Sequence, residues 1–347
     1  MRGRIALVVI SCALSLATGW VLSRGGAAPL PGAGRKPLIG FSLDTLQEER
    51  WQKDRDFLVA RAKELGADTL VQSANSDDTR QISDVQALIS NKVDVLIIAP
   101  HNGAAMAKAV AMAHEASIPV ISYDRLITGG DPDLYISFDA VKVGAEQARF
   151  LISKLKPGRP MRMIRVFGAK TDNNARLFKR GQDEALQPYL DKGAIKILHE
   201  DWADNWKPEN SKKIVNAAIT RFGRDFDAVL ASNDGTAGGA IQALMEEGLD
   251  GKVLVTGQDA ELSACQRIVR GTQAMTIYKP LSALAGRAAE TAVRMAKGRP
   301  IVAAAAVDNG KIQVPSILLD VVTVTKDNMD AAVVKDGFQK REEVYGR

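Results

Sequence analysis

The most constraining feature of the chain is a pattern that occurs twice. Residues 93–124 run from an apolar segment through a polar loop and an alanine-rich stretch to a second apolar segment that ends on Asp124. Residues 226–259 repeat this succession and end on Asp259. Each copy predicts a strand, a polar loop, a helix, a second strand and a carboxylate, which is the repeating unit of a parallel α/β sheet.

Polar side chains follow the predicted strands in both copies. Ligands of open α/β sheets collect at the carboxyl ends of the strands. We therefore expect Asn102, Asp124 and Arg125 of the first copy, with Asn233 and Asp259 of the second, to face one shared cleft. The alternative is that any doubly wound domain repeats such a pattern for its packing alone. The recurrence of polar residues at matching strand ends favours the shared cleft.

The length and the alternation of elements predict two lobes. A chain of 347 residues exceeds what one compact core supports. Predicted strands such as 38–43 and helices such as 48–65 alternate up to about Lys297, and the pattern restarts after Asp139. We therefore expect an α/β fold with two doubly wound, mainly parallel sheets, helices on both faces of each, and a lobe boundary near Phe138.

The N-terminal segment, residues 1–28, predicts export. Arg2 and Arg4 form a positive region, residues 5–22 form an uncharged stretch of 18 residues, and residues 25–28 are small, as a signal peptidase requires. We expect cleavage near the two alanines of that last group. An uncleaved anchor is the alternative, since such a stretch just spans a bilayer. In both cases the folded part is periplasmic or otherwise extracytoplasmic.

Charge and cysteine content exclude some functions. The formal net charge is +5, of which Arg2, Arg4 and Arg24 contribute three, so the remaining chain is nearly neutral and has no nucleic-acid footprint. A repressor would also need a helix-turn-helix before Leu38, where the export segment lies. After cleavage Cys265 is the single cysteine, and we expect it to be a buried thiol without a disulfide.

The sequence offers no catalytic, metal or cofactor motif. The three histidines do not have metal-ligand spacing, and no nucleophile elbow or dinucleotide fingerprint is present. Residues 235–239 are glycine-rich and open a predicted helix but lack the lysine of a phosphate-binding loop. The candidate carboxylates suit hydroxyl binding better than an acid/base pair. We therefore expect a protein that is not an enzyme and has no cofactor.

The polar residues in and after the predicted strand ends suit a neutral polyol. A sugar needs carboxylates, amides and cationic groups for its hydroxyls, and an aromatic plate for its C–H face. Trp51 and Trp206 lie in polar segments and are candidate plates, whereas Trp202 is expected to be structural. Three cations match three carboxylates among the candidates: Arg50, Arg125, Lys279, Asp124, Asp172 and Asp259.

Nine motifs, in order between about Leu38 and Arg341, resemble the xylose-binding branch of the ribose/galactose type of periplasmic sugar-binding proteins. They are residues 49–56, 71–75, 123–125, 135–139, 172–175, 231–234, 238–244, 257–260 and 275–280. Residues 42–45 and 168–171 depart from that branch, and a neighbouring branch that binds several aldoses shares three of the motifs. The resemblance implies that ten residues contact the sugar: Arg50, Trp51, Asp124, Arg125, Asp172, Asn174, Trp206, Asn233, Asp259 and Lys279.

The same resemblance implies the type I periplasmic binding protein fold, with three crossings between lobes. They would lie near Asp139, Lys279 and Lys311, which assigns residues 37–138 and 280–311 to the first lobe and residues 139–279 and 312–347 to the second. The implied function is capture of D-xylose or a related aldose by a monomer that closes around it and delivers it to an ABC transporter permease. The alternative is a sensor that presents the bound sugar to a receptor or kinase.

Overall fold

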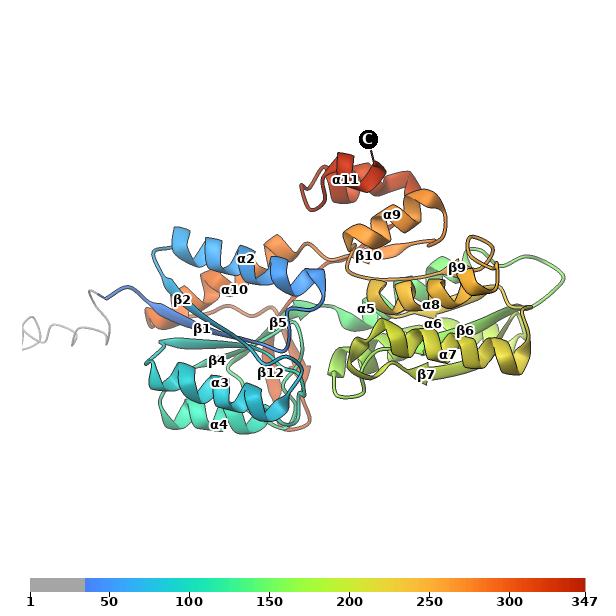
Figure 1. Cartoon of the computed structure of the whole chain (residues 1–347). Helices are drawn as coiled ribbons and strands as arrows, with labels where there is room; N and C mark the ends of the chain where they lie inside the picture. The colour runs from blue at the N-terminus through green and yellow to red at the C-terminus, as the bar shows by residue number, and fades with distance from the viewer. Residues whose placement is uncertain (1–34, 347) are drawn as a thin grey trace, which may run out of the picture.

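The computed structural model of the chain describes residues 35–346, in which two α/β lobes lie side by side (Figure 1). The predicted export segment lies outside these residues. None of the described helices is long and apolar enough to span a bilayer. The expected fold class, two α/β lobes built on parallel sheets, is confirmed.

The first lobe contains a seven-stranded sheet with the order β11-β12-β5-β4-β3-β1-β2. Neighbouring strands are parallel except for the β11–β12 pair. Strands β3, β4 and β5 are buried throughout, as expected for parallel strands covered on both faces. The strands are β1 (Leu38–Leu43), β2 (Asp68–Ser73), β3 (Val95–Ala99), β4 (Val120–Tyr123), β5 (Leu134–Phe138), β11 (Ala305–Asp308) and β12 (Gln313–Leu319).

Four helices cover this sheet, two on each face (Figure 1). Helices α2 (Glu49–Glu64) and α10 (Leu281–Ala296) pack together on one face, and α3 (Asp78–Ser90) and α4 (Ala107–Glu115) pack on the other. Helix α3 begins at Asp78 because the Asp77 side chain accepts a hydrogen bond from the backbone N of Arg80. The predicted helix 48–65 agrees with α2, and α10 lies in the first lobe, within the range 280–311 expected there.

The second lobe contains a four-stranded parallel sheet with the order β7-β6-β8-β9. Helices α5 and α6 pack together on one face, and α7 and α8 on the other. The elements are α5 (Ala140–Ile152), β6 (Met161–Phe167), α6 (Asn173–Asp191), β7 (Ile195–Trp202), the 3-10 turn η1 (Asp204–Trp206), α7 (Pro208–Phe222), β8 (Ala228–Ala231), α8 (Asp234–Glu246) and β9 (Leu254–Val255).

A smaller group of elements lies beside the hinge and carries the C-terminus. It comprises α9 (Leu262–Arg270), the antiparallel pair β10 (Thr276–Tyr278) and β13 (Val322–Val324), the short helices η2 (Lys326–Asn328) and η3 (Asp330–Val334), and α11 (Arg341–Tyr345). Its apolar side chains continue the core of the first lobe past α10. Cys265 is buried in this core as a free thiol, as expected.

The third crossing between lobes differs from the expected position near Lys311. Strand β12 pairs in parallel with β5, so it belongs to the first-lobe sheet, and the segment around Lys311 is the turn of the β11–β12 hairpin. The Asn309 Nδ2 atom anchors that turn to the first lobe by donating to the Ile127 and Gly130 carbonyls, each at 2.9 Å. The chain leaves the lobe only between Leu319 and Val322.

Candidate ligand-binding site

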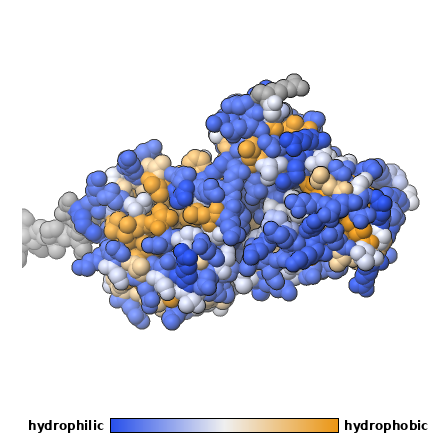
Figure 2. Space-filling model, in the orientation of Figure 1, coloured by the Kyte–Doolittle hydropathy of each residue, from blue (hydrophilic) through white to orange (hydrophobic). Residues whose placement is uncertain are grey.

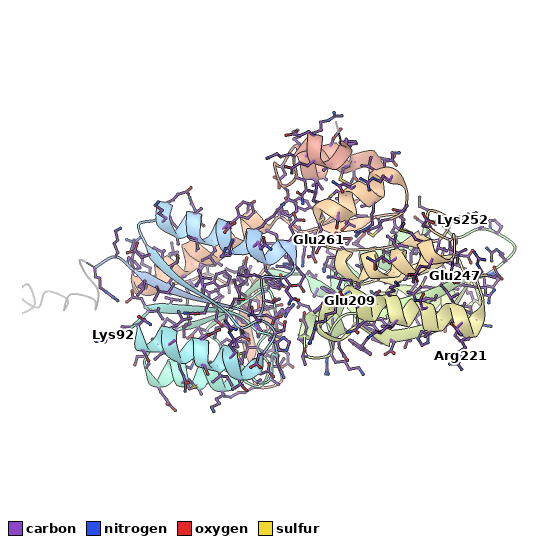
Figure 3. The ribbon with its side chains drawn as sticks, viewed as in Figure 1. Lys92, Glu209, Arg221, Glu247, Lys252 and Glu261 are labelled. Atoms are coloured by element: carbon purple, nitrogen blue, oxygen red, sulfur yellow. The ribbon has the colours of Figure 1, made fainter. Side chains whose placement is uncertain are left out.

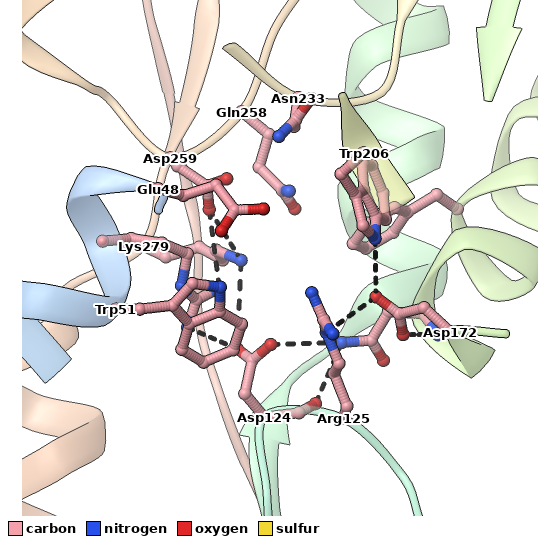
Figure 4. A pocket seen from close by; sticks show the side chains of 13 residues that line it. Glu48, Trp51, Asp124, Arg125, Asp172, Trp206, Asn233, Gln258, Asp259 and Lys279 are labelled. Atoms are coloured by element: carbon pink, nitrogen blue, oxygen red, sulfur yellow. Dashed lines mark hydrogen bonds and ion pairs between the residues drawn. The ribbon is translucent and has the colours of Figure 1, made fainter. Parts of the chain in front are cut away.

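A cavity between the two lobes collects the candidate residues (Figure 4). Its empty volume, which includes the solvent-filled space at its opening, is about 320 Å³. We call it the inner cavity. The residues that line it are Glu48, Arg50, Trp51, Asp124, Arg125, Asp172, Asn174, Phe178, Trp206, Asn233, Gln258, Asp259 and Lys279. All ten residues expected from the resemblance are among them.

Asn102 is the exception among the strand-end residues expected to face the cleft. Its Nδ2 donates to the Asp78 carboxylate at 3.0 Å, and its Oδ1 accepts from the backbone N of Ala104 and of Ala105. The Asn102 side chain therefore stabilises the loop before α4. The loop after β3 is longer than the loop after β8, where Asn233 caps α8 directly, so the asparagines of the two copies have different roles.

Arg50 is held by carboxylates from three parts of the chain. Its Nη2 lies 2.9 Å from Asp124 Oδ2 and 3.0 Å from Asp54 Oδ2, and its Nη1 lies 3.5 Å from Asp259 Oδ1. Burial raises the pKa of Asp54 to about 6, and the Tyr123 hydroxyl donates to that carboxyl from behind. Asp54 and Tyr123 therefore fix the orientation of Arg50 without lining the inner cavity.

Asp124 is the point where the lobes meet at the base of the inner cavity. Its Oδ1 accepts from Asn174 Nδ2 at 3.3 Å, and its Oδ2 lies 3.9 Å from Lys279 Nζ. Burial opposes ionisation of Asp124, but the charges of Arg50 and Lys279 outweigh it and hold the pKa of that carboxyl below its ordinary value. Its φ is +58°, a backbone conformation that is uncommon outside glycine and is often found at functional sites.

Arg125 joins the two lobes on the opposite wall. Its Nη1 donates to Asp44 Oδ2 at 2.6 Å, and its Nε lies 2.9 Å from Asp172 Oδ2 of the second lobe. Burial disfavours the charged guanidinium, but these two carboxylates raise the pKa of Arg125 above its ordinary value. Asp44 follows β1 directly, so the strand-end rule could have identified it from the sequence.

Lys279 and Asp259 form the third ion pair, with Lys279 Nζ 2.9 Å from Asp259 Oδ1. Lys279 follows β10 at the second crossing, and Asp259 follows β9 with a φ of +100°. Asn233 lies beside them, and its Oδ1 accepts a hydrogen bond from the backbone N of Thr236 at 2.9 Å. Its amide oxygen is therefore committed to helix α8, and its Nδ2 is the group available to a ligand oxygen.

The two tryptophans are held in different ways. The guanidinium carbons of Arg50 and Arg125 lie 4.1 Å and 5.0 Å from the Trp51 ring centroid, within cation–π range. Trp206 donates through Nε1 to Asp172 Oδ2 at 3.1 Å. Its ring lies so close to Gly168 that a Cβ there would sit 2.0 Å from Trp206 Cη2. Trp202 packs on Phe167 and does not line the inner cavity, as expected.

Three lining residues were not expected: Glu48, Phe178 and Gln258. Phe178 lies one helical turn after Asn174 on α6, and Gln258 directly precedes Asp259, so helical spacing and strand-end position were the available signals. Glu48 precedes α2. It also changes the charge balance, because four carboxylates and three cations line the inner cavity instead of three of each.

The chemistry of the inner cavity is therefore that of paired donors and acceptors. Cations donate, carboxylates accept, and both are already oriented by ion pairs inside the protein. No group of histidine, cysteine or acidic side chains among residues 35–346 has the arrangement of a metal site. Such a site can bind a compact polar molecule that donates and accepts several hydrogen bonds.

Comparisons with known proteins agree with this geometry. Residues 39–300 match the family described as periplasmic binding protein domain. The D-xylose-binding periplasmic protein of Haemophilus influenzae is 47% identical over 88% of this chain and 92% of its own length. The D-xylose-binding periplasmic protein of Escherichia coli is 47% identical over the same shares of the two chains.

Solved structures show the same architecture. A carbohydrate transporter solute binding protein from Chloroflexus aurantiacus, in complex with D-glucose, has 32% sequence identity and a TM-score of 0.83. The similarity covers 89% of this chain and 98% of that one. The match extends over both lobes and the cavity between them, so the chain belongs to the periplasmic binding protein family.

Proposed function

We propose that the protein captures D-xylose, or a closely related aldose, in the inner cavity and delivers it to an ABC transporter permease. The observation that carries the proposal is a polar cavity between the lobes in which each cation is already paired with a carboxylate. A neutral polyol adds hydrogen bonds without adding charge, whereas a phosphate would face four carboxylates. D-xylose is the proposed sugar because the two relatives at 47% identity are D-xylose-binding proteins.

The ten residues expected from the resemblance act as ligand contacts in this proposal. Arg50, Arg125, Lys279, Asn174 and Asn233 donate to sugar oxygens. The carboxylates Asp124, Asp172 and Asp259 accept from sugar hydroxyls, because an ionised carboxylate is an acceptor only. Trp51 and Trp206 contact the C–H faces of the ring, where an aromatic surface replaces water without competing for hydroxyls.

Sugar binding drives closure of the lobes. Arg50, Trp51, Asp124 and Arg125 come from the first lobe, and most other contacts come from the second, so an open form offers only part of the hydrogen bonds. The ligand therefore has a higher affinity for the closed form and shifts the population toward it. The closed form then docks on the permease as a monomer, and the sugar leaves unchanged.

Export places this process outside the cytoplasm. Residues 1–28 are removed as a signal peptide in the proposal, which leaves a mobile carrier in the periplasm. Mass spectrometry of the mature N-terminus tests this step. Retention of residues 1–28 would favour the alternative, a membrane-anchored sensor that presents the sugar to a receptor.

Calorimetry of the purified mature protein against D-xylose, L-arabinose, D-ribose, D-glucose and D-galactose tests the proposed ligand. We expect saturable binding of D-xylose with one sugar per chain and weaker binding of the other aldoses. Xylose 1-phosphate, which keeps the pyranose ring, is the anionic control and should not bind. The absence of binding to all five aldoses would contradict the proposal, and conversion of D-xylose into new products would contradict a purely binding role.

A further inference from the structure

Three acceptor atoms in the inner cavity have no hydrogen-bond partner among residues 35–346: Glu48 Oε2, Gln258 Oε1 and Asp259 Oδ1. Asp259 Oδ1 is in ion pairs with Lys279 and Arg50, which leaves Glu48 Oε2 and Gln258 Oε1 with neither an ion pair nor a hydrogen bond. Glu48 belongs to the first lobe and Gln258 to the second, and both side chains point into the cavity (Figure 4). The Gln258 side chain is 3% exposed. A buried acceptor without a donor is costly, typically about 1–3 kcal/mol, and donors are therefore expected where such atoms face a binding cavity.

The Glu48 side chain does not cap the helix that it precedes. It occupies the N-cap position of α2 with extended backbone angles, but its side chain makes no capping hydrogen bond. Glutamate is also not among the residues preferred at N-caps, whose short side chains reach the first turn. Burial raises the pKa of Glu48 even though Arg125 favours its ionised form. Its carboxylate is turned toward the inner cavity.

Glu48 and Trp206 separate the inner cavity from a second, larger space, which we call the outer cavity. The outer cavity is lined by Gln47, Glu48, Glu49, Asn205, Trp206, Lys207, Pro208, Glu209, Asn210, Lys213, Gly235, Glu261 and Ser263. Glu48 and Trp206 are the two residues that line both spaces. Figure 3 labels Glu209 and Glu261, two of the residues that line the outer cavity, close to the boundary between the two lobes. Figure 2 shows that the surface along this boundary is mostly hydrophilic.

The two residues of this partition differ in how firmly they are held. Asp172 fixes the Trp206 indole through its Nε1, and Gly168 lies against the ring. The Glu48 Oε2 atom has no such partner among the described residues. Glu48 is therefore the less firmly held of the two residues at the place where the outer and the inner cavity meet, which we call the mouth of the inner cavity.

We propose that Glu48 and Gln258 are specificity-determining hydroxyl acceptors at the mouth of the inner cavity, and that they select unsubstituted monosaccharides that direct a free hydroxyl toward them. The inference rests on the proposed function. An aldose hydroxyl in this position donates its single proton in a three-centre hydrogen bond shared by the two acceptors, one from each lobe. An O-methylated or glycosylated oxygen has no proton to donate, and its substituent meets the partition formed by Glu48 and Trp206.

Calorimetry with D-xylose and its four monodeoxy analogues tests the assignment. Glu48→Ala should weaken D-xylose binding by about tenfold to a hundredfold, the range of one hydrogen bond to a charged group. One analogue, which lacks the hydroxyl that faces Glu48, should bind the wild type and Glu48→Ala with the same affinity. Glu48→Gln retains an acceptor and should lose less affinity for D-xylose than Glu48→Ala does. Gln258→Met should weaken D-xylose binding but leave the affinity for that same analogue unchanged.

Glu209→Gln is the matched control, because Glu209 lines the outer cavity only and the substitution removes the same charge. Its affinity for D-xylose should equal that of the wild type. An unchanged affinity of Glu48→Ala for D-xylose would overturn the inference. It would also be overturned if Glu48→Ala lost the same binding free energy for D-xylose and for every analogue, because that result indicates a general effect on closure. If the wild type binds no aldose at all, the proposed function itself fails, so the two failures are distinguishable.

Discussion

Replacing Asp259 with alanine tests the arrangement of the site most directly. The Asp259 side chain is 5% exposed and lies 2.9 Å from Lys279 Nζ and 3.5 Å from Arg50 Nη1 through its Oδ1. No other described carboxylate pairs with Lys279 at comparable distance, since Asp124 Oδ2 is 3.9 Å away. Asp259 therefore orients the lysine and, in the proposed function, accepts two sugar hydroxyls.

The expected loss of binding free energy follows from this geometry. A hydrogen bond to a charged group contributes about 1.5–3 kcal/mol, and two bonds to one carboxylate are not fully additive. The uncompensated Lys279 charge adds a further cost that is partly relieved by Asp124. We expect Asp259→Ala to weaken D-xylose binding by about 2–4 kcal/mol, which corresponds to an increase in Kd of roughly 30-fold to 900-fold.

Isothermal titration of wild type and variant with D-xylose measures this loss. Asp225→Ala is the control, because Asp225 is in the same lobe, is 74% exposed and pairs with Arg162 at the surface, where an ion pair contributes little. Circular dichroism establishes that the variant is folded at the assay temperature. A folded Asp259→Ala protein that binds D-xylose within threefold of the wild type would refute the reasoning.

Three further predictions concern the aromatic plates, closure and pH. Saturating D-xylose should change tryptophan fluorescence, and the change should shrink in Trp206→Leu but persist in Trp202→Leu; an unaltered change in Trp206→Leu would contradict ring contact. Small-angle scattering should give a smaller radius of gyration with D-xylose than without, and no decrease with glycerol; identical profiles at confirmed saturation would exclude ligand-driven closure. Because burial raises the folded-state pKa of Asp54 to about 6, its contribution to the free energy of unfolding is present at about pH 4 and lost as pH rises through 6. Urea unfolding should therefore show the wild type losing stability relative to Asp54→Asn between pH 4 and pH 7, and a constant difference would contradict this assignment.

Local sequence rules predicted much of the fold, because they depend on neighbours in the chain. The predicted helix 48–65 and the restart of the pattern after Asp139 need no distant partner, and each agrees with the observed bounds. The strand-end rule also placed Asp124 and Asp259 on one cavity, since each sheet presents the carboxyl ends of its parallel strands along one edge and the two edges face each other between the lobes.

The rule failed where a distant partner competes for the same side chain. Asn102 follows a strand as Asn233 does, but its Nδ2 donates a hydrogen bond to the Asp78 carboxylate of a neighbouring helix. The third crossing was misplaced because β12 pairs with β5, which lies far away in the sequence, and no local signal specifies that pairing. Glu48 lacks a local signal as well, since its role depends on what faces it across the cavity.

The sequence by itself determined that the chain forms two parallel α/β lobes and which strand ends carry polar groups, because periodicity and capping are properties of short segments. Only the tertiary structure decided how those groups pair. Arg125 with Asp172 and Asp124 with Asn174 join residues from different lobes, and such pairs exist only when the lobes close. The tertiary structure also decided which acceptors stay free at the mouth, because burial and distance to a donor are set by packing between segments remote in the chain.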